Sequence, residues 1–598
     1  MTVNIAWLLC LLPVSAALAG NLTVSQAYYR DTNASLHLLL ANHSKQPVSV
    51  LPPLVNGYDL ASLGRDELRA RDVLWYRCRP NLIAPGGMAD LTIVLSKPID
   101  KPAAVEVRTA SGEKIQRVIP CVPEPLRFQA IRFSRDLRAV DLYVRWADES
   151  DVSRLRKIYL DGQDVRQLSS PWPAQSFHGL AFTRISFPKP LVKNSFHVLE
   201  VEGEGGLSTG YQIRAIPAEF LIGVYGSLTE KNVSDWAAHG CNHYLSFGGI
   251  PLEFLDITAE RGISAGAKYI PEHLADRDAG KVSIFDEEVA RMAVSEVMEK
   301  PGLLYHHLVD EPDVADYYAG RWLGATAMEL AARSEFLEKL DPGRYTFVQL
   351  DNTFRPENYR VYGEAADVLA THRYSLGNFL GSEAGRKTYK RLPFLEDMLD
   401  TIDRFRRTTE PKPLFMVPQF FHLGKGRAGR APTVEEMRLQ CYVMIAGGAR
   451  GLIHYIHSGS MGGGEGGRAK ALWDAMAGLH EELKRVGEIV ESGTPAPADW
   501  VKTDSPHILA SVVLCGNEMA VVLINRSHRS APETFVARPV RDVQVSVRVP
   551  PWIDASALQI LPAEGGAVLP GQLDSDGLHF TADEVRDAHC FLLRLKRG

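Results

Sequence analysis

The sequence predicts a multidomain fold in which a (β/α)8 barrel, or TIM barrel, is flanked by N-terminal and C-terminal β-sandwich domains. Three observations support this prediction. The chain has 598 residues, more than one ordinary domain holds. Between residues 218 and 495, short apolar runs alternate with helical segments, a pattern typical of parallel strands with crossover helices. On both sides of that region, strand-like alternation is punctuated by turn residues.

The first residues resemble a secretory signal peptide. An apolar stretch leads to Ala17, Leu18 and Ala19, a small-x-small pattern after which cleavage is expected. The segment has no Lys or Arg near its start, so a buried N-terminal strand is the alternative. We expect residues 1–19 to be removed and the protein to be secreted or periplasmic.

Residues 20–123 and 124–217 are expected to form two β-sandwiches. The segments "NLTVSQAYYR" and "ASLHLLLANHSKQPVSVL" alternate polar and apolar residues in the first. The segment "RFQAIRFSRDLRAVDLYVRWA" does so in the second, after the proline-rich stretch "IPCVPEPL". We expect these domains to pack against or support a cleft rather than to carry chemistry.

Eight strand-and-connection units fill residues 218–495, the expected size of a (β/α)8 barrel. All the connections except the fifth, a short irregular return, contain a helical segment. The expected strands are Phe220–Gly226, Cys241–Gly248, Ile263–Ile270, Leu303–Pro312, Tyr345–Asn352, Asp367–Gly377, Pro413–Phe421 and Gly451–Ser458.

The chain returns to strand-like alternation after the barrel. Residues 496–598 are expected to form a third β-sandwich, which begins near the linker "ESGTPAPADW". A glycine-rich loop, Ser458–Gly467, follows the eighth strand and is expected to be either a lid or a plain connector. It does not end in Gly-Lys-Ser/Thr, so it is not a phosphate loop.

Composition excludes several classes of partner. The net charge is −6 and there is no long basic run, so no nucleic acid partner is expected. No later run approaches the roughly 20 apolar residues that span a bilayer. Cys10 leaves with the signal; Cys78 with Cys121, and Cys515 with Cys590, are candidates for disulfides or for buried thiols. No CxxC motif or His/Cys cluster is present, and neither a metal nor a cofactor is expected.

The active site of a (β/α)8 barrel lies at the C-terminal ends of its strands. Here those ends are rich in carboxylates, amides, imidazoles and phenols, which bind sugar hydroxyls and stack on sugar rings. A carbohydrate is therefore the expected substrate. The strand-end residues are Tyr225, Ser246, Lys268, Tyr269, Asp310, Glu311, Gln349, Asp351, His372, Tyr374, Gln419, His454, Tyr455 and His457.

Glu311 is the expected general acid for cleavage of a glycosidic bond. The fourth strand ends in "VDEPD", which places Asp310 directly beside Glu311. Repulsion between like charges raises a carboxyl pKa, as suits a group that must hold a proton near neutrality. The alternative is that these acidic residues only begin the following helix, where they favour its dipole.

The second catalytic group is not a glutamate at the end of strand seven, because Gln419 is there. A substrate-assisted route needs no such glutamate: the sugar's own 2-acetamido group attacks the anomeric carbon. That route requires one acid, an adjacent carboxylate to orient the acetamido group, and a tyrosine hydroxyl for its oxygen. Asp310 and Glu311 fit the first two roles, and Tyr374 or Tyr455 the third. Tyr225, His372 and Gln419 are further expected sugar contacts.

The Asp310-Glu311-Pro312 motif at the end of strand four, a barrel behind β-sandwich domains and an export signal together resemble glycoside hydrolase family 123. The adjacent acid pair also resembles the hexosaminidases of family 20. The first resemblance implies a β-N-acetylgalactosaminidase with a substrate-assisted retaining mechanism. It implies Asp310 as the carboxylate that orients the acetamido group and Glu311 as the general acid/base.

Two alternatives remain open on the sequence. One is a glycosidase of the large barrel clan, or an inverting enzyme, that uses Asp351 or Glu465 as its second carboxylate. The other is a catalytically inactive barrel that only binds glycans, because a barrel fold alone does not imply activity.

Overall fold

The computed structural model describes most of the chain, and the following account concerns that part. The described residues are 21–122, 124–147, 153–246, 248–269, 287–313, 324–351, 358–374, 394–421, 432–457, 466–530 and 535–596. The expected signal peptide, Glu465 and nearly all of the glycine-rich loop lie outside these ranges.

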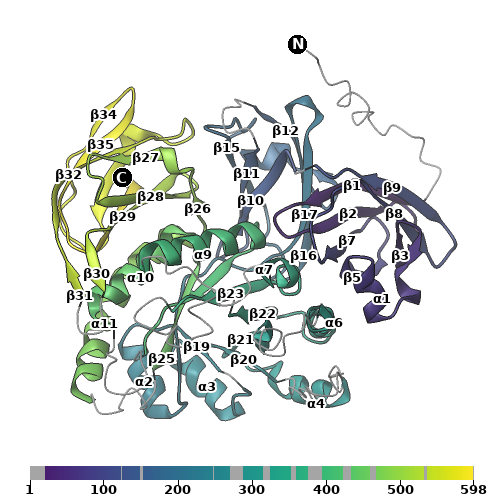
Figure 1. Cartoon of the computed structure of the whole chain (residues 1–598), viewed down its shortest axis with the longest axis horizontal. Coiled ribbons are helices and arrows are strands. Elements are labelled where there is room, and N and C mark those ends of the chain that lie inside the picture. The colour runs from purple at the N-terminus through teal and green to yellow at the C-terminus, as the bar shows by residue number, and fades with distance from the viewer. Residues whose placement is uncertain are drawn as a thin grey trace. The chain divides into compact units, whose positions relative to one another are not determined.

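The chain forms two compact units (Figure 1). The first contains Met1–Phe128, Val144–Ala181 and Phe196–Ile213, and the second contains Gln129–Tyr143, Phe182–Ser195 and Arg214–Gly598.

The N-terminal part of the first unit is a β-sandwich, as predicted. One sheet has the order β1 (Leu22–Arg30), β2 (Ser35–Asn42), β7 (Met88–Leu95), β5 (Val73–Arg79). The other has the order β4 (Tyr58–Asp59), β3 (Val48–Val55), β8 (Ala103–Thr109), β9 (Lys114–Ile119). Short elements β6 (Leu82–Ile83) and α1 (Arg65–Ala70) complete it.

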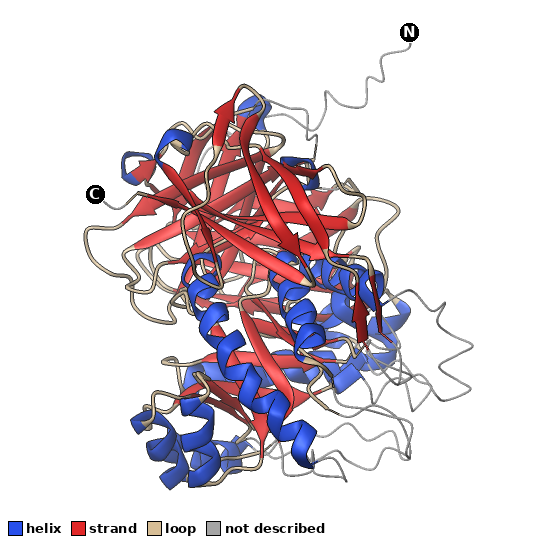
Figure 2. Cartoon of the chain, turned by 90° about the vertical axis from the view of Figure 1, so that its left-hand side faces the viewer, coloured by secondary structure: helices blue, strands red, loops and turns tan. Residues whose placement is uncertain are grey.

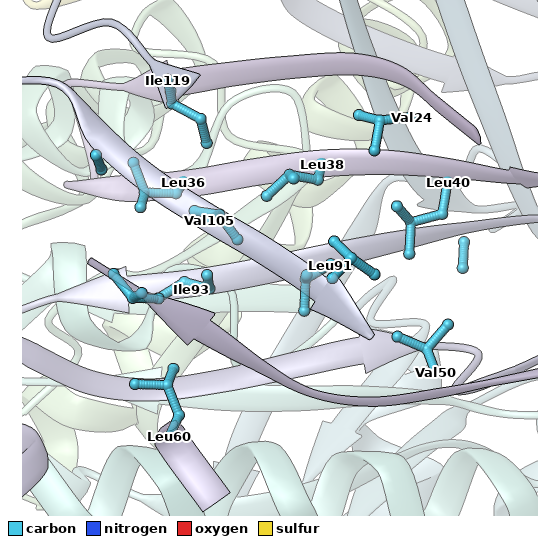
Figure 3. Close-up of a cluster of buried hydrophobic side chains, with 14 of the residues drawn as sticks. Val24, Leu36, Leu38, Leu40, Val50, Leu60, Leu91, Ile93, Val105 and Ile119 are labelled. Carbon is cyan, nitrogen blue, oxygen red and sulfur yellow. The ribbon is translucent and has the colours of Figure 1, made fainter. Parts of the chain in front are cut away.

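The core of this sandwich follows from the two-residue period of its strands. Leu36, Leu38 and Leu40 alternate along β2 and are all fully buried. They join Leu91 and Ile93 of β7 in one apolar cluster with side chains from the facing sheet (Figure 3). Burial of this apolar surface is the main term that stabilises the domain.

Two further four-stranded sheets follow along the chain. One has the order β10 (Leu126–Phe133), β11 (Ala139–Trp146), β15 (Leu180–Ser186), β14 (Ser169–Ser170). The other has the order β13 (Gln163–Asp164), β12 (Leu155–Leu160), β16 (Phe196–Gly203), β17 (Ser208–Arg214). Residues 124–217 are therefore rich in strands, as expected, but they are divided between the two units.

The predicted barrel is confirmed: eight parallel strands close on themselves in sequence order. They are β18 (Leu221–Gly226), β19 (His243–Leu245), β20 (Ser264–Ala267), β21 (Leu303–Asp310), β22 (Tyr345–Leu350), β23 (Val368–His372), β24 (Leu414–Val417) and β25 (Gly451–His457). The helices between and after them, labelled in Figure 1 and drawn in blue in Figure 2, are α2 (Glu230–Ala238), α3 (Leu252–Glu260), α4 (Glu287–Val297), α6 (Gly324–Leu340), α7 (Asn358–Tyr362), α9 (Phe394–Thr409), α10 (Val434–Ala446) and α11 (Gly466–Val490).

Side-chain caps begin two of these helices. The Thr229 hydroxyl accepts a hydrogen bond from the backbone N–H of Asn232 at 3.1 Å at the start of α2. At α10, the Thr433 and Glu436 side chains each accept from the other's backbone N–H, which is a capping box.

The barrel interior is packed with side chains. Tyr305, Phe347 and Phe415 lie in one buried cluster with Tyr225 from the first strand. The adjacent histidines of β21, His306 and His307, face opposite ways, because side chains alternate along a strand. His306 Nε2 lies 2.8 Å from Asp341 Oδ2, whereas the ring of His307 contacts Phe347 in the interior.

A C-terminal β-sandwich follows the barrel in the same unit. One sheet has the order β26 (Thr494–Pro495), β28 (Ile508–Cys515), β29 (Glu518–Asn525), β36 (Ala588–Leu595), β33 (Leu558–Pro562). The other has the order β27 (Val501–Thr503), β32 (Val540–Val547), β35 (Gly577–Val585), β34 (Gln572–Asp574). Edge-on contact between Phe580 and Phe591, with ring centroids 5.0 Å apart, joins the two sheets. The hairpin β30 (His528–Ser530) and β31 (Phe535–Ala537) lies apart from both sheets.

The six cysteines among the described residues are free thiols, so the disulfide alternative for Cys78, Cys121, Cys515 and Cys590 is not realised. No helix in the described part of the chain is long and apolar enough to cross a membrane.

A buried ion pair fixes the N-terminal end of the barrel. Asp367, directly before β23, accepts hydrogen bonds from Arg214 Nη1 at 2.8 Å and from the backbone N–H of Thr346 at 2.9 Å. Both charged side chains are at most 3% exposed. We predict that Arg214→Met lowers the free energy of unfolding by about 3–5 kcal/mol, because it leaves the Asp367 carboxylate buried without its counter-charge.

Urea denaturation, followed through the transition that reports on the barrel, checks this prediction. Lys470→Met is the matched control: Lys470 pairs with Asp474, but the two side chains are 75% and 52% exposed. That variant should change stability by less than about 1 kcal/mol. Equal effects of the two substitutions would contradict the role given to the buried pair.

Candidate active site

One extra residue in β21 determines which way Asp310 points. Phe347 of β22 belongs to the interior core, and Gln349 follows on the same face of that strand. The last regular pair of the two strands is His307 with Phe347. The next pair is Asp310 with Gln349, so β21 contains one residue more than β22 between these pairs. This bulge brings Asp310 to the interior face, whereas strict alternation from His307 would turn it outward.

Glu311 leaves the strand in a left-handed backbone conformation. Its φ is 47°, a value that residues other than glycine rarely adopt and that clusters at functional sites. The Glu311 N–H donates to the Gln349 carbonyl at 3.0 Å. Two residues later, Asp313 Oδ1 accepts from the N–H of Asp351 at 3.0 Å. These hydrogen bonds connect the ends of β21 and β22 and hold Glu311 at the barrel mouth.

His372, the last residue of β23, joins the two carboxylates. Its Nε2 lies 3.0 Å from Asp351 Oδ1 and 3.5 Å from Glu311 Oε1. The His372 and Asp351 side chains are buried, whereas the Glu311 side chain is 32% exposed. The ends of three consecutive strands therefore bring together a cation and two carboxylates, with only Glu311 open to a ligand.

Burial raises the pKa of Glu311 to about 7, from an ordinary value near 4.5. The charge of His372 lowers the pKa of Glu311, while the charges of Asp310 and Asp351 raise it. The direction agrees with the sequence-based expectation, but burial is a larger cause than repulsion by Asp310. A pKa of about 7 makes both the protonated and the ionised form of Glu311 accessible near neutral pH, which suits a group that donates and then recovers a proton.

The pKa of His372 is raised. Burial of the ring lowers this pKa, but the hydrogen bond and charge of Asp351, together with the charges of Glu311 and Asp310, outweigh that effect. The site therefore favours the imidazolium form of His372 more than water does, and that form can balance the neighbouring carboxylates.

Three aromatic rings at the strand ends form a partly exposed cluster. Tyr374 and Tyr455 have ring centroids 5.9 Å apart at an interplanar angle of 23°. Phe421 meets both edge-on, at 4.8 and 5.6 Å. Tyr374 also stacks on His372 at 4.2 Å, so the cluster is continuous with the charged group. Tyr374 and Tyr455 are therefore placed beside the carboxylates.

Tyr225 and Gln419 lie deeper than the rest of the expected site. Both residues are 0% exposed. The Tyr225 hydroxyl donates to Gln349 Oε1. The Gln419 N–H donates to Gln440 Oε1 at 2.9 Å, and its side-chain amide donates to the Phe421 carbonyl at 3.5 Å. Their role as sugar contacts stays a prediction, and it would require that these side chains become accessible.

Two other strand-end residues, His454 and His457, bond elsewhere. His454 Nε2 lies 3.1 Å from His480 Nε2 of α11, outside the barrel interior. His457 Nδ1 accepts from the Trp236 indole at 2.9 Å, and its Nε2 lies 3.6 Å from Asp235. Among the residues with described positions, no group of three or more His, Cys, Asp or Glu side chains could hold a metal ion.

Gln349 is the residue to which sequence reasoning assigned no role. It is 1% exposed, its carbonyl accepts from the Glu311 N–H, and its side-chain oxygen accepts from the Tyr225 hydroxyl. The sequence does place Gln349 two residues before Asp351, and residues two apart in a strand lie on the same face, here the interior one. Its partners, however, come from β18 and β21, and local sequence does not reveal such contacts.

No family model and no curated protein matches the chain. Several solved structures are similar to it. A cycloisomaltooligosaccharide glucanotransferase from Paenibacillus sp. has 10% identity and a TM-score of 0.43, over 78% of this chain and 99% of that one. A glycoside hydrolase family 5 protein from Bacteroides vulgatus has 13% identity and a TM-score of 0.40, over 66% and 90%.

A family 30 endoxylanase from Clostridium papyrosolvens has 13% identity and a TM-score of 0.37, over 63% of this chain and 98% of that one. Identities this low, with TM-scores below 0.5, do not carry these proteins' activities over to this chain. Its own residues must support any function.

We predict that His372→Phe raises the pKa of Glu311 above 7, because it removes the positive charge that opposes burial. Asp310→Asn should lower the same pKa, because it removes a negative charge. Infrared difference spectroscopy measures the titration, with the Glu311→Gln spectrum subtracted to isolate this one carboxyl. Shifts in the same direction for both variants would contradict the electrostatic account.

Proposed function

We propose that this chain is a glycoside hydrolase in which Glu311 is the general acid/base. The observation that carries this proposal is a partly exposed carboxyl with a pKa of about 7 at the C-terminal mouth of a closed barrel. Glycoside cleavage requires such a group, because the leaving oxygen must be protonated as the bond breaks. The adjacent Tyr374 and Tyr455 rings offer partly exposed surfaces on which a sugar ring can stack.

Asp351, the second carboxylate considered for an inverting mechanism, has a partner of its own. Asp351 Oδ1 and Glu311 Oε1 both contact the same nitrogen of His372, at 3.0 and 3.5 Å. The Asp351 carboxylate is therefore engaged by a buried imidazole, whereas a general base must be free to take a proton from water. Asp351 is better explained as the partner of His372.

Asp310 supports the substrate-assisted form of this proposal. The bulge in β21 brings it to the interior face beside Glu311, and its charge acts on Tyr374 and Tyr455. In the proposed first step, the acetamido oxygen bonds to the anomeric carbon while the glycosidic oxygen leaves with the proton of Glu311. Asp310 stabilises the positive charge that develops on the acetamido nitrogen. In the second step, water attacks the anomeric carbon and gives a proton to Glu311, while the bond from that carbon to the acetamido oxygen breaks and the acetamido group is restored.

We also propose, on the N-terminal sequence alone, that the protein is exported and acts outside the cytoplasm. The amino-sugar specificity, like the resemblance to glycoside hydrolase family 123, is part of the proposal and is tested by the substrates named next.

We predict that Glu311→Gln lowers turnover of aryl 2-acetamido glycosides by about 10²–10⁴-fold, because the amide cannot donate the required proton. Binding of the sugar should be largely retained, since the substitution keeps the shape of the side chain. Steady-state kinetics and calorimetry with the released sugar measure the two effects. Unchanged turnover would remove Glu311 from its assigned role, and absence of turnover in the unmodified protein would favour a barrel that only binds.

We predict that Asp310→Asn lowers kcat on acetamido substrates at least tenfold more than on plain aryl hexosides. The reason is that only the acetamido reaction places positive charge on a nitrogen that Asp310 can stabilise. Comparison of the two substrate classes with the same leaving group isolates this effect. Equal losses on both classes would contradict substrate assistance and leave the general-acid role of Glu311 intact.

A further inference from the structure

We propose that two buried arginines, Arg132 and Arg450, form a binding site for a small monovalent anion such as chloride, at the end of the barrel opposite the active site. Arg132 is on β10, and Arg450 directly precedes β25. Both belong to the compact unit that contains the barrel. This inference goes beyond the proposed function and does not depend on the role of Glu311.

Hydrogen bonds to the main chain hold both arginines at the starts of neighbouring barrel strands. Arg132 Nη1 donates to the carbonyl of Pro411 at 2.6 Å, and its Nη2 donates to that of Lys412 at 3.4 Å. The backbone N–H of Arg450 donates to the carbonyl of Leu414, the first residue of β24, at 2.8 Å. The two arginines therefore bind the same short stretch of main chain.

A second segment connects the Arg450 guanidinium group to the strand that carries Arg132. Arg450 Nη2 donates to the carbonyl of Gly493. The next residue, Thr494, accepts from Gln129 Nε2 at 2.9 Å through its hydroxyl. Because Gln129 and Arg132 are both on β10, the two guanidinium groups lie in one buried region at the N-terminal end of the barrel.

Neither guanidinium group pairs with a carboxylate in the part of the chain that the structure describes. All the groups that accept from them are main-chain carbonyls. Arg132 is 8% exposed and Arg450 is 2% exposed, and the Nε atom of each is buried without a hydrogen-bond partner among the described residues. Each arginine therefore has an N–H group left to donate.

The acidic residues whose charges act on this region are already paired with other arginines. Glu410 acts on the first guanidinium group and Glu491 on the second. Glu410, however, forms an ion pair with Arg406. Glu491 accepts from Arg135 Nε and Nη2, both at 2.7 Å. The two buried cations are thus left without a counter-charge of their own.

Both arginines remain charged near neutral pH. Burial, with the charge of Arg450 as a smaller cause, lowers the pKa of Arg132 to about 9. Burial lowers the pKa of Arg450 to about 10. A buried charge without a counter-ion is unfavourable, and two like charges in one region add to the cost. An anion that accepts from both Nε–H groups removes this cost, whereas a water molecule would satisfy the hydrogen bonds but not the charge.

Diffraction from crystals grown with bromide as the anion tests the site without any substitution. We expect an anomalous-scattering peak within hydrogen-bonding reach of the Nε atoms of both Arg132 and Arg450. Absence of a peak there, or a water molecule in that position, would overturn the inference.

Thermal unfolding of the full chain tests the site in solution. Chloride is compared with glutamate, a much larger anion, at the same ionic strength, so that screening of surface charges is equal. The Tm should rise with chloride concentration and then level off, because a ligand that binds only the folded state stabilises it by mass action. Equal Tm values in the two salts at every concentration would contradict a specific chloride site.

Two substitutions locate the chloride effect. Arg450→Met removes one charge and one donor, and it should weaken chloride binding by more than about tenfold, because a hydrogen bond to a charged group is lost. Arg184→Met is the matched control. Arg184 binds Asp141 through Nε at 2.6 Å and Nη2 at 2.8 Å, so its counter-charge belongs to the chain.

The comparison of these variants is made on the change in Tm with chloride, so a general loss of stability in either one cancels. The control should keep the chloride dependence of the unmodified protein, and Arg450→Met should lose it. An unchanged dependence in Arg450→Met, or an equal loss in both variants, would overturn the inference. If Arg450→Met does not fold, the bromide position in the unmodified protein still decides.

Discussion

The contact of one buried imidazole with two carboxylates organises the mouth of this barrel. His372 lies within 3.5 Å of both Asp351 and Glu311, so the ends of β21, β22 and β23 converge on a single charged group. Without that cation, three neighbouring acidic side chains would repel one another in a partly desolvated site. With it, Asp351 is held as a buried counter-charge, and Glu311 is left as the accessible carboxyl with a pKa near neutrality.

The barrel and the sandwiches could be predicted from sequence because their signals are local. Each barrel strand is a short apolar run, and nearly every connection contains a helical segment. The predicted number of eight strands is therefore correct even where the predicted ends of a strand are off by a few residues. The opposite directions of His306 and His307 follow from the two-residue period of a strand. The same reasoning brought Asp310, Glu311, Asp351 and His372 to one mouth, because parallel strands end together.

The details of the site could not be predicted, because they depend on contacts between strands. The extra residue in β21 is determined by its pairing with β22, and it reverses the direction that alternation gives to Asp310. The hydrogen bond of Tyr225 joins the first and fifth strands, which are 124 positions apart in sequence. The cause of the raised Glu311 pKa also differs from the expected one. Repulsion by Asp310 contributes, but desolvation by burial raises this pKa more.

The most direct test of the central claim is the pH dependence of kcat/KM on two aryl 2-acetamido glycosides, one with a poor and one with a very good leaving group. If Glu311 is the acid, the rate with the poor leaving group falls as pH rises through about 7, where Glu311 loses its proton. The rate with the good leaving group, which needs no protonation, should stay nearly constant over the same range. A basic limb that is identical for both substrates would contradict the assignment of Glu311 as the proton donor.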